Sequence, residues 1–170
     1  MIEISLIRDL VAIFGVIAGF SYYVLTVKAT RRNQEQQLET RQAQLYMQIF
    51  NRFASEEGTN RALEILESEW KDYEDFNNKY GSDNNREWAS KRNHVFMEHD
   101  AIGYLLHRGL LDIDMVYQIN GYATKLVWDH FKSIIQEQRK QLDWPDWMRW
   151  FEYLANRIDE YEKQQTQFKT

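Results

Sequence analysis

The sequence of 170 residues contains no cysteine, which excludes disulfides, thiolate catalysis and cysteine-ligated zinc. It has one proline and seven scattered glycines, so few residues interrupt a helix and none form a glycine-rich phosphate loop. The formal net charge is −5, without the broad basic surface that nucleic-acid binding requires. These absences favour long helices and exclude nucleic acid as a partner.

Charge is also missing from the stretch between Leu10 and Val27. As a helix, these roughly 18 residues would extend about 27 Å, close to the hydrocarbon thickness of a bilayer. Tyr22 and Tyr23 lie near one boundary, where amphipathic rings are favoured. A cleavable signal and a buried core helix are the alternatives. The segment before the apolar run is not basic, no A-x-A site follows it, and core helices are rarely apolar all round for this length. We therefore expect a retained transmembrane helix.

The flanks of this span predict its orientation. Lys28, Arg31, Arg32 and Arg41 follow it, whereas only Arg8 precedes it. Cytoplasmic flanks carry the excess of Lys and Arg. We expect a single-pass protein of the cell membrane, with its N-terminus outside and the rest in the cytoplasm. The basic flank of Lys28, Arg31 and Arg32 can also contact anionic membrane lipids.

Small residues lie on one side of the expected span. Gly15 and Gly19 form a G-x-x-x-G pair, and Ala12 is nearby. Small residues four positions apart let a second helix approach closely. These three residues are our candidate helix-packing surface, although the pattern is also common by chance.

Composition divides the chain into four parts: a transmembrane helix over 1–30, a polar helical stalk over 31–44, a helical bundle over 45–163 and a frayed tail over 164–170. Apolar residues begin a helix face at the end of the stalk, with seven- and four-residue spacing. This face either docks on the chain's own domain or forms a short coiled coil between subunits. Its residues are Leu38, Leu45, Ile49 and Phe53.

The first helices of the bundle follow from capping residues and spacing. Ser55 before two glutamates predicts a helix start. The expected apolar face of that helix is Ala62, Leu66, Trp70 and Tyr73. The stretch 77–85 is rich in turn-forming residues and predicts a loop. The next helix should start near Asn84 or Arg86 and end at Gly109, and its apolar face comprises Val95, His99, Ile102 and Leu106.

Two more helices complete the expected bundle. Asp112 is a candidate N-cap for a helix whose apolar residues are Met115, Ile119, Leu126, Trp128 and Ile135. Asp143 and Pro145 predict the start of the last helix, with an inner face of Trp147, Phe151, Leu154, Ile158 and Tyr161. The fold class is therefore all-α, with one N-terminal transmembrane helix and a cytoplasmic bundle of about five helices.

Two clusters are candidate functional sites. His94 and Glu98 share a helix face, and a metal site would need further ligands, such as Asp129 and His130. The structural alternative is a solvated pair of His94 and Glu98 beside a hydrogen-bonded core His99. The second cluster is the aromatic run at 143–151, whose Trp144, Trp147 and Trp150 form either a partner surface or part of the core.

Three stretches resemble an uncharacterised prokaryotic family of single-pass membrane proteins with an all-helical domain, described only as a domain of unknown function. They are LYMQIFNRFASEEGTNRALEIL, AIGYLLHRGLLDIDMVYQINGYATKLVWDHFKSII and WFEYLANR. The resemblance covers nearly the whole chain, with GxLLxRGLLDxD as its most specific part. It implies the same architecture and no activity.

We find no catalytic constellation and predict no enzyme activity, cofactor or metal. We expect a non-catalytic accessory or scaffolding subunit that assembles with other membrane proteins or with copies of itself. The alternative is a membrane-tethered, metal-dependent enzyme or effector that uses the region of His94 and Glu98.

Overall fold

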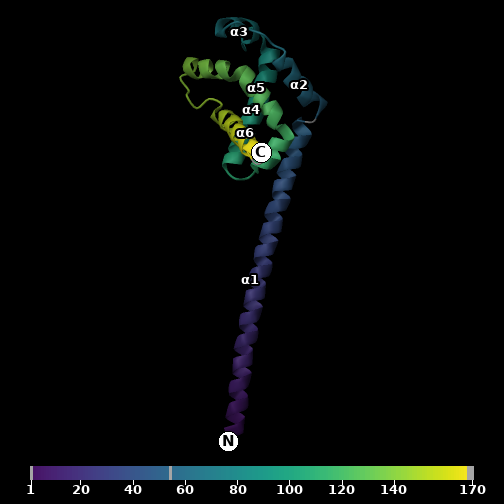
Figure 1. The fold of residues 1–170 in the computed structure, drawn as a ribbon, viewed down its shortest axis with the longest axis vertical. Coiled ribbons are helices and arrows are strands. Elements are labelled where there is room, and N and C mark those ends of the chain that lie inside the picture. The colour runs from purple at the N-terminus through teal and green to yellow at the C-terminus, as the bar shows by residue number, and fades with distance from the viewer. Residues whose placement is uncertain (1, 54, 168–170) are drawn as a thin grey trace. The chain divides into compact units, whose positions relative to one another are not determined.

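The computed structural model describes residues 2–53 and 55–167, and the side chains of residues 6–52 and 55–167. Within these ranges the structure has six α-helices and no strand (Figure 1). The chain divides into two compact units, one ending at Gln44 and one starting at Leu45. An all-helical fold with one long apolar N-terminal helix and a helical bundle is confirmed.

Helix α1 is continuous from Ile2 to Phe53. No proline interrupts it, and its polar part is rich in Gln, Glu and Arg, which are good helix formers. The predicted helical stalk is thus present as an extension of the apolar helix. Within the second unit, Leu45 and Ile49 pack against core residues. Leu38 is exposed, and the Phe53 side chain lies outside the described residues.

The predicted helix after Ser55 is shorter than its apolar spacing indicated. Helix α2 (Glu56–Leu66) starts where expected, because the Ser55 side chain accepts a hydrogen bond from the amide of Gly58 at 3.0 Å. It ends before Trp70, so a single helix through Tyr73 was wrong. Asp72 caps a separate helix, α3 (Tyr73–Tyr80), which takes up part of the expected loop. The aromatic residues of the predicted face still pack against the core, Trp70 from the connection after α2 and Tyr73 from α3.

Helix α4 (Arg86–His107) starts at one of the two predicted positions, and α5 (Ile113–Gln141) starts directly after its predicted cap, Asp112. The side chain of Asn85 accepts from the Trp88 amide at 3.1 Å, and that of Asp112 accepts from the Asp114 amide at 2.8 Å. Gly109 has φ of 66°, the left-handed conformation predicted for a residue that ends a helix.

Of the apolar residues expected on α5, Ile135 is fully buried and the other four are less so. Met115, Ile119 and Trp128 are only partly buried, and Leu126 is exposed. Two polar residues, Asn120 and Thr124, lie on the buried face and hid its spacing. The buried positions of α5 are Val116, Asn120, Gly121, Thr124, Val127, Phe131, Ile134 and Ile135.

Helix α6 (Arg149–Gln167) starts later than Asp143 and Pro145 predicted. Trp147 precedes the helix, whereas Phe151, Leu154 and Ile158 are fully buried, as expected. The tail predicted to fray from residue 164 is helical to Gln167, and residues 168–170 lie outside the described range.

The domain core has an aromatic and an aliphatic part, both organised around the packing of α6 on α4 and α5. The aromatic part joins four helices through fully or nearly fully buried rings: Phe76, Trp88, Phe96, Phe131 and Phe151. The aliphatic part is centred on Ile102, Leu106, Leu111, Val116, Leu154 and Ile158.

Candidate functional site

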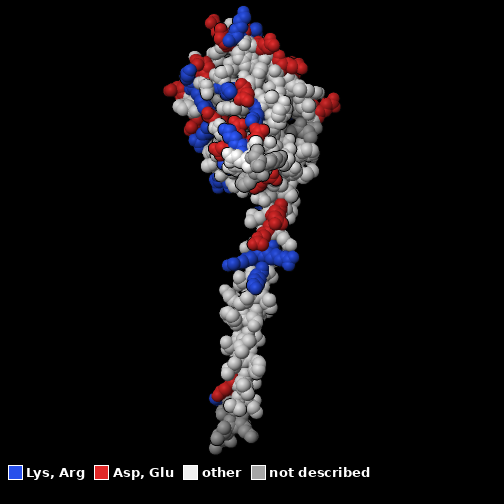
Figure 2. Space-filling model, viewed as in Figure 1, with Lys and Arg blue, Asp and Glu red and all other residues white. Residues whose placement is uncertain are grey.

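The apolar part of α1 is the first candidate surface. The helix containing Leu6–Arg52 is long and apolar enough to cross a membrane, and its apolar window buries nothing within the chain. It is therefore not the core helix of the domain. Figure 2 shows this stretch of the helix free of charge, with Lys and Arg gathered at one end. Lys28, Arg31 and Arg32 are all exposed there.

The small residues on α1 remain uncovered within the described chain. Ala12, Gly15 and Gly19 are exposed, and a Cβ atom built on either glycine would meet nothing within 4 Å. The space beside this helix face is therefore open to another helix. The three predicted helix-packing residues form one open strip, whose occupant the single chain does not contain.

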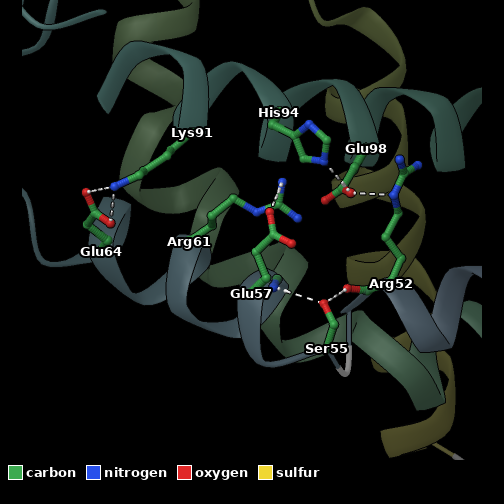
Figure 3. Close-up of polar contacts among 9 residues, drawn as sticks. Arg52, Ser55, Glu57, Arg61, Glu64, Lys91, His94 and Glu98 are labelled. Atoms are coloured by element: carbon green, nitrogen blue, oxygen red, sulfur yellow. Dashed lines mark hydrogen bonds and ion pairs between the residues drawn. The ribbon is translucent and has the colours of Figure 1, made fainter. Parts of the chain in front are cut away.

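The second candidate is a polar group around a largely buried carboxylate, which we call the Glu98 cluster: Arg52, His94 and Glu98. Arg52 Nε and His94 Nε2 each lie 3.0 Å from Glu98 Oε1. The Glu98 side chain is 9 % exposed, against 63 % for Arg52 and 40 % for His94 (Figure 3). A carboxylate with so little access to water is stabilised by a cationic partner, which Arg52 supplies.

The Glu98 cluster corrects the expected solvated pair. His94 and Glu98 do meet, but the carboxylate is buried and a third residue, Arg52, reaches it from the last turn of α1. Sequence spacing could not reveal Arg52, because 46 positions separate it from Glu98 and only the turn at Ser55 brings the helices together.

Further ion pairs lie beside this cluster, and one of them, Lys91 with Glu64, joins α4 to α2. Lys91 lies 2.9 Å from both Glu64 and Glu87, and Arg61 lies 3.9 Å from Glu57 (Figure 3). Hydrogen bonds to Glu64 and Glu87 raise the pKa of Lys91 above its ordinary value. These contacts are surface ion pairs, which position the two helices but add little stability.

The other proposed metal ligands make contacts of a structural kind. His130 Nε2 lies 3.0 Å from the carbonyl oxygen of Ser68, and Asp129 pairs with Lys132. Among the residues that the structure describes, no three His, Asp or Glu side chains gather as a metal site would require. The carboxylate of Glu98 instead contacts the side chains of Arg52 and His94.

His99 and Asp100 have separate structural roles in α4. His99 is 2 % exposed, and its Nδ1 donates to the carbonyl oxygen of Val95 at 2.8 Å. Burial lowers its pKa to about 4, so the ring is neutral near pH 7. Asp100 Oδ1 accepts from the backbone amides of Trp150 and Phe151 at 2.9 and 3.0 Å, and so caps α6.

The three tryptophans of the predicted partner surface have different surroundings. Trp144 is 53 % exposed, whereas Trp147 and Trp150 are half-buried. Trp147 donates from Nε1 to Gln138, and its carbonyl accepts from Arg139 at 2.8 Å. Trp150 packs beside aromatic rings and under Arg149. Only Trp144 is therefore a largely free ring, on a loop held by its neighbours.

Comparison with known proteins identifies the family. The family described as Domain of unknown function (DUF4760) matches residues 7–158, nearly the whole chain. The chain belongs to this family, which confirms the expectation of an uncharacterised domain family. No curated protein and no solved structure matches the chain.

Proposed function

We propose that this protein is a non-catalytic accessory or scaffolding subunit, anchored in a membrane by the apolar part of α1. The observation that carries the proposal is the open strip of Ala12, Gly15 and Gly19 on an exposed apolar helix. In lipid, helices associate through close van der Waals contact at such small residues. The strip would bind a helix of another membrane protein or of a second copy.

The contacts within the domain support a structural role. Several polar residues that could have served chemistry are engaged in holding helices: Asp100 and Asp112 cap helix starts, and His99 bonds within the core. The Glu98 cluster also joins α1 to α4. These assignments fit a domain that is held firmly and presents its surface to partners.

The orientation in our proposal follows from the basic band of Lys28, Arg31 and Arg32, which would lie on the cytoplasmic side. Protease added to spheroplasts should leave the domain intact and digest it only after the membrane is opened. Digestion of the domain in intact spheroplasts would reverse the orientation.

Extraction of the full chain from its native membranes tests the proposal. Mild detergent, sizing and mass spectrometry should find the chain in a larger assembly with stoichiometric companions or copies. Replacing both Gly15 and Gly19 with Leu should release it as a monomer. The matched control replaces Ile13 and Ile17, on the other side of the helix, with Leu and should leave the assembly unchanged. A monomeric wild type, or a double Gly variant that assembles normally, would contradict the proposal.

A further inference from the structure

A pocket in the domain opens between α2 and α5. Its volume is about 250 Å³. The rim carries exposed apolar side chains of both helices, Leu63, Tyr122 and Leu126. The deeper wall is α4, which contributes the buried Val95 and His99. Because the wall is buried and the rim exposed, this is a hollow with depth and not a flat patch.

The size and lining of the pocket select a class of ligand. A cavity of about 150 Å³ in another protein holds a benzene molecule, so the pocket has room for one or two fused rings. Its lining is mainly apolar, with Ala62, Leu66, Val95, Ala123 and Val127, and it also includes the polar Thr59 and Asn120. Apolar walls with a few placed polar groups are typical of small-molecule sites.

Glu98 supplies the polar group that gives the pocket a preference. It lines the pocket, and both of its ion pairs use Oε1. A carboxylate oxygen accepts hydrogen bonds and donates none when ionised. A bound molecule that carries an N–H or O–H group is therefore complementary to this pocket in hydrogen bonding as well as in size.

We propose that the pocket between α2, α4 and α5 binds a small apolar ring compound carrying one N–H or O–H donor, with that donor bonded to Glu98. This site is separate from the strip on α1, so the inference does not depend on the proposed assembly. Indole is a suitable probe because it has the right size and one donor, and 1-methylindole matches it closely but lacks the donor.

Equilibrium dialysis of radiolabelled indole tests the inference on the full chain in nanodiscs, with empty nanodiscs to measure partition into lipid. We expect saturable binding at one site per chain, and binding of 1-methylindole at least about tenfold weaker, because a hydrogen bond to a charged group is lost. Uptake equal to that of empty nanodiscs, or equal affinity for the two compounds, would overturn the inference.

Variants that fill the pocket locate the bound probe. Ala62→Phe on α2 and Ala123→Phe on α5 each place a ring at a partly exposed lining position and should abolish saturable binding. Ala101→Phe, at an exposed position of α4 outside the pocket, is the matched control and should bind normally. Normal binding by both filled variants would place the probe elsewhere and refute the site.

Discussion

Three residues within little more than one turn of α4 each make a contact on which the packing of this domain depends. His99 is buried and hydrogen-bonded, Asp100 caps α6, and Gly103 lies against the backbone of Trp150. His99 and Asp100 fall in the segment that sequence reading put forward for metal binding. Their contacts reach across to other helices, so spacing along one helix could not reveal their partners.

At Gly103 we predict that replacement by alanine destabilises the domain by about 1–3 kcal/mol, as overpacking does. A Cβ atom there would collide with the carbonyl oxygen of Trp150, where α4 and α6 pack closely. Helix propensity alone gives the opposite sign, since alanine is favoured over glycine by about 1 kcal/mol within helices. Denaturant unfolding of the full chain in detergent, followed by tryptophan fluorescence, decides the sign, and a more stable variant would refute the close approach.

His99 should make the domain less stable in acid. Its pKa is about 4 when folded and 6.5 in the ordinary state, so the unfolded chain takes up the proton first as the pH falls. The contribution is complete above about pH 6.5 and is lost progressively towards pH 4, amounting to about 3 kcal/mol. Unfolding free energies measured across this range should fall less steeply in His99→Gln.

The control for this pH dependence is His107→Gln, because His107 is exposed. The wild-type slope should persist in that variant. If His99→Gln kept the full wild-type slope, the acid sensitivity would have another origin and the assignment of His99 would be wrong.

At the scale of helices, the start of α6 separates what sequence could predict from what it could not. Pro145 lies two residues after Asp143, a pattern typical of a helix start, yet Asp143 has φ of 48° and the helix begins six residues later. The cap comes from Asp100, 50 positions away from Trp150. Local capping at Ser55, Asn85 and Asp112 was predictable because donor and acceptor are neighbours in sequence.

Asp100→Ala should therefore destabilise the domain by about 0.5–2 kcal/mol, as the loss of a helix cap does. Asp143→Gly should be neutral or slightly stabilising, because glycine adopts positive φ without strain. Thermal unfolding followed by circular dichroism compares the two variants. A larger loss of stability in Asp143→Gly than in Asp100→Ala would mean that Asp143, and not Asp100, caps the helix.

The contact of α1 with α4 through the Glu98 cluster can be measured by a double-mutant cycle. Arg52→Gln and Glu98→Gln should show a coupling of about 0.5–1 kcal/mol, kept modest because the Arg52 side chain is 63 % exposed. Arg41→Gln, an exposed arginine earlier on α1, should show no coupling with Glu98→Gln. Equal coupling for both arginines would mean a general charge effect and no specific pair.

Two further differences between the expected and observed helices concern which residues are buried and where a helix ends. Asn120 and Thr124 lie on the buried face of α5, whereas the apolar Leu126 is exposed. Trp70 and Tyr73 continued the apolar spacing of α2 although the helix ends at Leu66. In both cases tertiary packing, which a periodic pattern does not contain, determined which residues are buried.

At the scale of the whole molecule, composition predicted the organisation well. One uncharged stretch, few helix breakers and a polar stalk indicated a long N-terminal helix followed by a helical domain, and the fold has both. The match to the DUF4760 family runs from residue 7 to 158 and so includes both the long helix and the domain. The partner that contacts the apolar part of α1 is identified by experiment.

Site-specific photocrosslinking in native membranes tests the central claim, that this helix assembles through its small-residue face. A photoreactive residue at Ala12 lies on the same side as Gly15 and Gly19, whereas one at Ile17 lies on the opposite side. The account predicts a discrete protein adduct from position 12 and none from position 17. No adduct at position 12, or the same adduct from both positions, would contradict it.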